Sequence, residues 1–151
     1  MLQYKYTVSL LTSNGQKKTV IQILHFMDSN ENTTKVTVSL NYDGKNFLGH
    51  GADYYWIDAI ADLQKNLPKE VIIHSCLTCK HGNMCPVGND QNEVFCLKDI
   101  TPKNKEDLFF YTEDYTERDK RRREYFGFCE DYAPQSVDYF TYNDFLCYLN
   151  K

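Results

Sequence analysis

Four of the six cysteines in this chain fall within the twenty-one residues from Cys76 to Cys96, with the spacing C-x2-C-x5-C-x10-C. Gly82, Pro86 and Gly88 lie between them and favour turns that bring the chain back on itself. A Cys-x-x-Cys turn presents two sulfurs to one ion, and later cysteines on a returning chain complete a tetrahedron. The spacing therefore predicts a cysteine-rich metal-binding loop, with structural zinc as the leading interpretation.

The predicted zinc ligands are Cys76, Cys79, Cys85 and Cys96. Cys85 is the contested member, because Met84-Cys85-Pro86 also suits a turn whose thiol packs among apolar groups. The other candidates for the fourth ligand are Cys129, which comes next, His74 and His81. Iron–sulfur chemistry, disulfides or redox-active thiols, and free buried cysteines remain open. A site of four thiolates is coordinatively closed, so it stabilises a loop and offers no position for a water nucleophile.

Length and composition predict one soluble α+β domain over residues 1–151. No apolar run approaches the length of about 20 residues that spans a bilayer. The first residues lack the basic region and apolar core of a secretory signal, so we expect a cytoplasmic protein. In the reducing cytoplasm, cysteines serve as metal ligands more often than as disulfides. The net charge of −4 and the sequence pI of about 5.5 make nucleic acid an unfavoured partner.

Alternation of apolar and polar residues predicts an antiparallel β-meander in the first third of the chain. It is clear from Tyr4 to Leu10 and again from Val36 to Tyr42, with the two-residue period of half-buried strands. Asn14-Gly15 between them suits a tight hairpin turn. The run 18–27 is apolar on both faces and predicts a central strand.

A helix is predicted from Asp53, as its cap, to Leu67, where Pro68 prevents continuation. Its apolar stripe consists of Trp56, Ile60, Leu63 and Leu67. A strand over 70–74 then leads into the cysteines. Farther on we expect a strand or extended segment over 108–111, with the start of a helix as the alternative, and an exposed helix over 116–125. A short terminal helix is predicted to begin after Asp144 and to pack through Phe145, Leu146 and Leu149.

Two charged segments in the last third are candidate contact surfaces. Residues 117–124 carry five positive and three negative charges, and helical pairing of Asp119 with Arg122 or Arg123 and of Lys120 with Glu124 makes a solvated face the first interpretation. The following segment interleaves acids with aromatics and suits a basic partner, although its aromatics also suit a core. Its interface candidates are Glu130, Asp131, Tyr132, Asp138, Tyr139 and Tyr142.

No nucleophile stands beside a partner base in a recognisable catalytic motif. The leading hypothesis is a non-catalytic protein-binding module with a structural zinc site, of the inhibitor or immunity type. In general character, a small, acidic, cytosolic α+β protein without a catalytic set is similar to the immunity proteins that neutralise bacterial toxins. The alternatives are a metal-dependent or redox enzyme that uses the Cys76–Cys96 cluster, and a zinc-containing nucleic-acid-binding protein that uses the arginine run.

Overall fold

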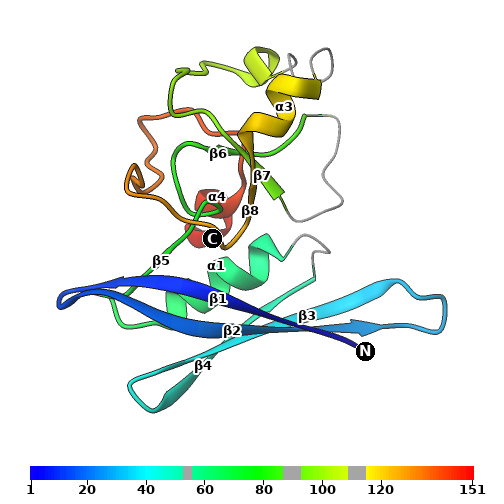
Figure 1. The fold of residues 1–151 in the computed structure, drawn as a ribbon. Coiled ribbons are helices and arrows are strands. Elements are labelled where there is room, and N and C mark those ends of the chain that lie inside the picture. Colours follow the sequence, from blue (N-terminus) through cyan, green and yellow to red (C-terminus); the bar gives the residue numbers. More distant parts are fainter. Residues whose placement is uncertain (53–55, 87–92, 109–114) are drawn as a thin grey trace. The chain divides into compact units, whose positions relative to one another are not determined.

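The structure is a computed structural model, and it describes residues 1–52, 56–86, 93–108 and 115–151. Its mixed architecture of antiparallel sheet and a few helices confirms the predicted α+β class (Figure 1). The chain forms two compact units, of which unit 1 comprises Met1–Ile73 with Asp144–Lys151 and unit 2 comprises His74–Asn143. The single domain expected from the length stays a prediction.

Unit 1 is built on a curled five-stranded sheet with the order β4-β3-β2-β1-β5. Neighbouring strands from β1 to β4 pair antiparallel, which confirms the predicted meander. The fourth strand, β4, was not predicted, because two of its seven residues are glycines and its polar residues mask the alternation. The strands are β1 (Leu2–Thr12), β2 (Gly15–Met27), β3 (Thr33–Tyr42), β4 (Lys45–Gly51) and β5 (Ile72–His74).

The inner face of this sheet forms the core of unit 1 with helix α1 (Ile57–Asn66). Alternate strand residues are buried there, as the sequence pattern predicts: Val8, Leu10, Ile21, Ile23, Val36, Val38 and Leu40. From α1, Ile57, Ile60 and Leu63 complete the layer. Helix α4 (Phe145–Leu149) packs on α1 and confirms the predicted terminal helix. The predicted cap Asp53 lies outside the described residues.

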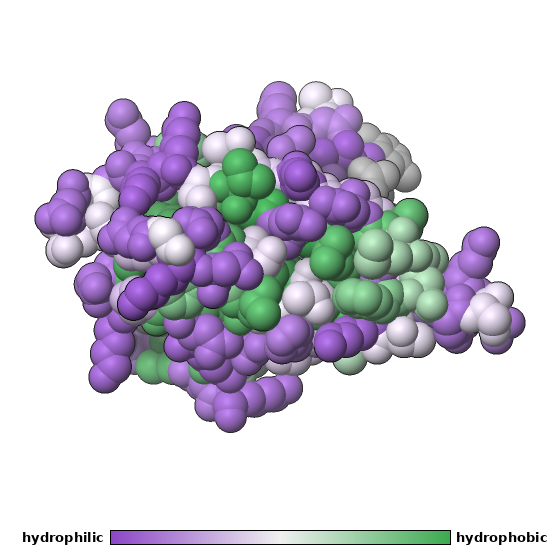
Figure 2. Space-filling view, turned by 90° about the horizontal axis from the view of Figure 1, so that it is seen from below, coloured by the Kyte–Doolittle hydropathy of each residue, from purple (hydrophilic) through white to green (hydrophobic). Residues whose placement is uncertain are grey.

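The outer face of the sheet is open and carries isolated apolar side chains among polar ones. Val20, Phe26 and Leu48 are 53%, 38% and 43% exposed. Figure 2, which views the molecule from below, shows hydrophobic areas on this face interrupted by hydrophilic residues. None of the helices within the described ranges has the length and apolar character needed to cross a bilayer.

Unit 2 contains a three-stranded sheet and very little helix. The order β6-β7-β8 joins β6 (Gly82–Asn83), β7 (Glu93–Cys96) and β8 (Arg122–Glu124), and both pairs are antiparallel. A 3-10 turn, η1 (Lys105–Leu108), precedes helix α3 (Tyr115–Arg121). Phe95, Leu97 and Leu108 form a small buried cluster.

The predicted helix over 116–125 is too long, because α3 ends at Arg121 and the next three residues form β8. Arg122 forms an ion pair of 2.9 Å with Glu93 on the neighbouring strand β7, so strand pairing overrides the helical pattern of the sequence. The expected Asp119–Arg122 pair is present at 3.5 Å, whereas Lys120 approaches Glu117, at 3.9 Å. In the extended segment predicted over 108–111, Leu108 ends η1, and residues 109–111 lie outside the described part of the chain.

His25 is a buried titratable residue in the core of unit 1, where it is 3% exposed. Its Nε2 accepts a hydrogen bond from the indole N–H of Trp56, and its Nδ1 lies 3.4 Å from the Thr33 hydroxyl. Trp56 adopts the left-handed conformation, with φ of 65°, just before α1. This bond and the ring contacts of Trp56 with Tyr4 and Tyr6 hold that unfavourable backbone conformation in place.

We expect the stability of the protein to fall as the pH drops below about 6.5, the ordinary pKa of histidine. Burial lowers the pKa of His25 in the folded chain, so at mildly acidic pH the unfolded chain binds more protons. The stabilisation is present above the unfolded pKa and is lost as pH falls toward the lower folded pKa. His25→Gln keeps an acceptor for the Trp56 N–H and should reduce the pH dependence of the urea midpoint, and the remainder comes from His74 and His81, whose pKa values burial also lowers. His50→Gln, at an exposed strand position, is the control and should keep the wild-type slope.

Candidate functional site

The Cys76–Cys79 segment forms a tight turn that is closed by local hydrogen bonds. The Thr78 N–H donates to the Ser75 carbonyl at 3.2 Å, and the Gly82 N–H donates to the Cys79 carbonyl at 3.0 Å. A side chain at Gly82 would collide with the Cys76 carbonyl oxygen, so glycine is required there. The turn is therefore held by its own backbone, by the Thr78 hydroxyl, which bonds to Ser75, and by the side-chain amide of Asn143, which donates to the Leu77 carbonyl.

Two backbone N–H groups, those of Ala133 and His81, donate hydrogen bonds to the Cys79 thiol. Such bonds stabilise the thiolate and act to lower its pKa. Burial acts in the opposite direction and has the larger effect, so the pKa of Cys79 is raised. A donor just after the turn and one from the distant residue Ala133 thus favour a thiolate at Cys79, and burial opposes it.

A distant part of the chain, residues 125–133, is held against this turn by backbone hydrogen bonds. The Cys76 N–H donates to the Gly127 carbonyl at 2.6 Å, and the Lys80 N–H donates to the Ala133 carbonyl at 2.8 Å. The Cys76 sulfur would lie 3.5 Å from a methyl group placed on Gly127. These bonds bring Cys129, between the two contact points, to the Cys-x-x-Cys turn.

Four cysteines line one pocket of unit 2: Cys76, Cys79, Cys96 and Cys129. They come from the turn, from the end of β7 and from the segment after β8, which are far apart in sequence. Lys98 and Arg123 line the same pocket. This set retains three of the four predicted ligands and includes Cys129, the second choice for the fourth.

Cys85, the first choice for the fourth ligand, does not line this pocket and packs against the cluster of Phe95, Leu97 and Leu108. Tertiary packing therefore gives Cys85 the apolar environment that its Met-Cys-Pro context also allowed. All six cysteines are free thiols, so the disulfide alternative receives no support. Cys147, in helix α4, is exposed.

Burial raises the pKa of the Cys76 thiol to about 12, and negative charge at Cys129, Cys79 and Cys96 adds to the rise. Arg123 opposes this effect with its positive charge. Several thiolates cannot share this pocket without a compensating cation, because each disfavours ionisation of the others. A bound divalent ion reverses that balance and deprotonates its ligands.

Within the described ranges, no group of three or more His, Cys, Asp or Glu side chains is arranged so that it could hold a metal ion. The cysteines therefore share a pocket without a formed coordination shell, and the predicted metal-binding loop stays a prediction. This arrangement fits protonated thiols, because without a cation no electrostatic attraction draws the sulfur atoms toward one point. Zinc ligation requires them to close to Zn–S distances of about 2.3 Å.

The two histidines considered as ligands differ in position. His74 packs against Tyr132 and Phe128 in tilted arrangements, with ring centroids 4.1 Å and 5.7 Å away, and does not line the pocket. His81 does line it, and its buried Nδ1 has no hydrogen-bond partner among the described residues. Burial is the main cause that lowers the pKa of each histidine. His81 is therefore a neutral group beside the thiols.

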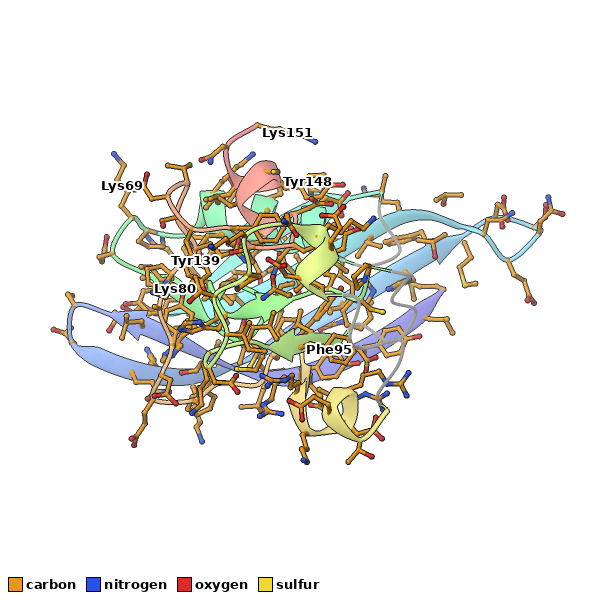
Figure 3. The ribbon with its side chains drawn as sticks, turned by 90° about the horizontal axis from the view of Figure 1, so that it is seen from above. Lys69, Lys80, Phe95, Tyr139, Tyr148 and Lys151 are labelled. Atoms are coloured by element: carbon orange, nitrogen blue, oxygen red, sulfur yellow. The ribbon has the colours of Figure 1, made fainter. Side chains whose placement is uncertain are left out.

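The aromatic residues of the predicted interface make contacts with other side chains of unit 2. The Tyr132 hydroxyl lies 3.3 Å from the Thr78 hydroxyl. Lys80 lies over the ring of Tyr139, 5.1 Å from its centroid (Figure 3). Tyr142 packs against the Phe95 cluster. These contacts favour the alternative in which the aromatics of this segment build the fold.

The acidic members of that interface are only partly available. Asp131 forms an ion pair with Lys98 at 2.6 Å, and the Lys98 hydrogen bond and charge lower its pKa. Glu130 and Asp138 are exposed. The surface is therefore less acidic than the sequence indicates, because its counter-charge comes from a lysine more than thirty residues away.

The sequence pattern of residues 117–124 did not indicate the role of Arg121, whose side chain is only 12% exposed. Its guanidinium binds both oxygens of Asp99, at 2.5 Å and 2.9 Å, and also pairs with Glu117. It donates to the Cys96 carbonyl at 3.2 Å. The hydrogen bond from Arg121 lowers the pKa of Asp99 to about 2. Arg121 thus ties α3 to the end of β7, where one of the pocket cysteines lies.

No protein-family profile matches this chain, and no match was found among curated proteins.

Proposed function

We propose that the chain is a non-catalytic protein-binding module in which structural zinc, held by Cys76, Cys79, Cys96 and Cys129, stabilises unit 2. One observation carries the proposal: four cysteines from three separate segments line a single pocket. Unit 2 has a three-stranded sheet with short strands, so a metal cross-link between separate segments would add to the order that its buried side chains supply. Structural zinc contributes on the order of 10 kcal/mol of binding free energy in small domains.

The residues around the thiols suit a closed zinc site. Four thiolates around Zn²⁺ carry a net charge of −2, and Arg123 brings positive charge to the same pocket. Lys98 also lines the pocket, where it is paired with Asp131. The backbone donors to Cys79 support a thiolate in the way that outer-shell partners support metal ligands. Four sulfur ligands leave no position for a substrate or for water, so the site favours a structural role over the enzyme alternative. A reducing cytoplasm keeps such thiols available.

The partner surface in this proposal comprises the remaining exposed groups of the last third of unit 2. Glu130 and Asp138 are exposed acids, and Phe128 and Val137 are 43% and 84% exposed. Exposed apolar side chains and acids within one segment suit a basic protein partner, and the resemblance in general character to immunity proteins suggests a toxin. The arginine run gives less support to nucleic-acid binding, because Arg121 and Arg122 are paired with acids.

Affinity capture with the immobilised full-length protein tests the partner claim. We expect one specific partner, retained by the wild type and lost from the variant Glu130→Lys/Asp138→Lys, because charge reversal repels a basic surface. The matched control Glu70→Lys/Glu106→Lys reverses two exposed acids elsewhere and should retain it. Equal retention by both variants, or no partner for the wild type, would contradict the proposal.

A further inference from the structure

A second pocket, in unit 1, lies where β1 begins, β2 ends and β3 begins. It encloses about 520 Å³, within the range of small-ligand sites, and Leu2, Tyr4, Met27 and Glu31 are among its lining residues. The proposed zinc site does not use any of these residues.

The backbone around this pocket departs from regular geometry in two places. The β2–β3 register shifts between Phe26 and Met27, a bulge of the kind that redirects side chains next to binding sites. Glu31 adopts the left-handed conformation, with φ of 63°. The Asp28 carboxylate fixes this loop by accepting the backbone N–H groups of Asn30 and Asn32, at 2.8 Å and 2.9 Å. The position of Glu31 is thus set before a ligand arrives.

The base of the pocket is aromatic and carries no positive charge. His25 lines it, and burial lowers the pKa of that histidine, so the ring is neutral at physiological pH. Tyr4, another lining residue, lies against Trp56 and His25, with ring centroids 5.4 Å and 5.5 Å away. An aromatic ring presents a negative face to a cation.

Among the described residues that line the pocket, Glu31 is the one that carries a negative charge. Within the described part of the chain, Glu31 forms no ion pair, and neither Lys nor Arg lines the pocket. Asp28 adds a second carboxylate in the same loop, and backbone hydrogen bonds from Asn32 and Asn30 lower its pKa. Leu2, 47% exposed, and Met27 add apolar surface beside these charges.

We propose that this pocket binds the cationic side chain of an arginine or lysine presented by a protein partner. Leu2 and Met27 contact the aliphatic stem, the Tyr4 ring faces the cation, and the Glu31 carboxylate pairs with it. The inference rests on the proposed function in supposing a protein partner, and it adds a contact for a basic group in unit 1.

The single tryptophan of the chain gives a direct readout, because Trp56 contacts the Tyr4 ring. Titration of the full-length protein with acetyl-Gly-Arg-Gly-amide should give a saturable change in Trp fluorescence and in the NMR shift of the indole N–H. The same peptide with citrulline, the neutral isostere of arginine, should bind at least about tenfold more weakly. Glu31→Gln should weaken arginine-peptide binding by a similar factor, and the control Glu70→Gln should not change it.

Equal binding of the arginine and citrulline peptides, or wild-type affinity in Glu31→Gln, overturns the inference. Butylguanidinium alone binding as tightly as the peptide overturns the partner claim in favour of a free small cation. Zinc content is measured on the same samples to separate the two proposals. Full zinc without peptide binding refutes the unit 1 pocket alone, whereas peptide binding by zinc-free protein refutes the zinc site alone.

Discussion

Cys129→Ala is expected to abolish zinc binding and to lower the melting temperature sharply, whereas Cys85→Ala is expected to retain one zinc per chain. Cys129 lines the four-cysteine pocket, and Cys85 packs against the Phe95 cluster. Loss of one thiolate opens a tetrahedral site and removes much of the binding free energy, which for structural zinc is on the order of 10 kcal/mol. Cys85→Ala removes only a partly buried sulfur, at a cost of about 1 kcal/mol.

If the protein binds no metal, the stability losses of the two variants should rank in the opposite order. The comparison therefore distinguishes a zinc-bound protein from a metal-free one. Cys129 is exposed, so in the absence of a metal its truncation costs almost nothing, and Cys85→Ala becomes the more damaging change. Zinc is measured by elemental analysis of protein purified under reducing conditions, and stability by thermal unfolding. A wild type with less than about half an equivalent of zinc and no iron refutes the site outright.

Cobalt substitution of the same samples separates the structural role from the enzyme alternative. Tetrahedral Co²⁺ with four thiolate ligands should give intense visible absorption that added cyanide or azide leaves unchanged, because no coordination position is open. A spectrum that shifts on addition of either anion indicates an open site and favours the metal-dependent enzyme. The Cys129→Ala protein should lose the spectrum, and Cys85→Ala should keep it.

Gly49→Ala is expected to destabilise unit 1 by about 3 kcal/mol or more. Gly49 pairs with Val38 in the sheet, and a side chain there would collide with the Ala59 carbonyl oxygen and the Leu63 nitrogen of α1. These neighbours are backbone atoms of a helix, which cannot rotate away as a side chain does. The substitution therefore forces α1 off the sheet, and urea unfolding measures the loss.

The control for Gly49→Ala is Gly44→Asn in the turn between β3 and β4. Gly44 also has a special conformation, with φ of 75°, but a side chain there meets no atom within 4 Å. Asparagine tolerates this left-handed conformation, so we expect a loss of well under about 1 kcal/mol. Similar urea midpoints for the two variants would show that α1 does not pack closely on β4.

Local patterns in the sequence predicted unit 1 well. Alternation over 4–10 and 36–42 placed both strands in register with a buried face, and the helical stripe identified α1. The strand β4 was missed because Gly49 contributes no side chain to the pattern. Gly49 is required because helix α1, which follows β4 in the sequence, packs closely on it. This requirement comes from tertiary packing and leaves no local pattern in the sequence.

The candidate site was predictable only where its parts are close in sequence. Spacing alone identifies Cys76 and Cys79, because a Cys-x-x-Cys turn is a local structure. Cys129 reaches the pocket through backbone hydrogen bonds of Cys76 and Lys80 to residues near it, and these contacts leave no periodic or compositional signal. The pairing of Asp131 with Lys98 and that of Arg121 with Asp99 depend on the same kind of long-range contact.

Unit 1 is discontinuous in sequence, which affects how it can fold as the chain emerges from the ribosome. Unit 1 includes Asp144–Lys151, which follow all of His74–Asn143, so α4 can dock on α1 only after unit 2 has been synthesised. While unit 2 is unfolded, the docking of α4 must close a flexible loop of 70 residues. Once unit 2 has folded, only a few flexible residues remain in that loop, and the entropic cost of closing it falls by about 2 kcal/mol. If zinc orders unit 2, then zinc supply during translation governs how readily the N-terminal sheet completes its own core.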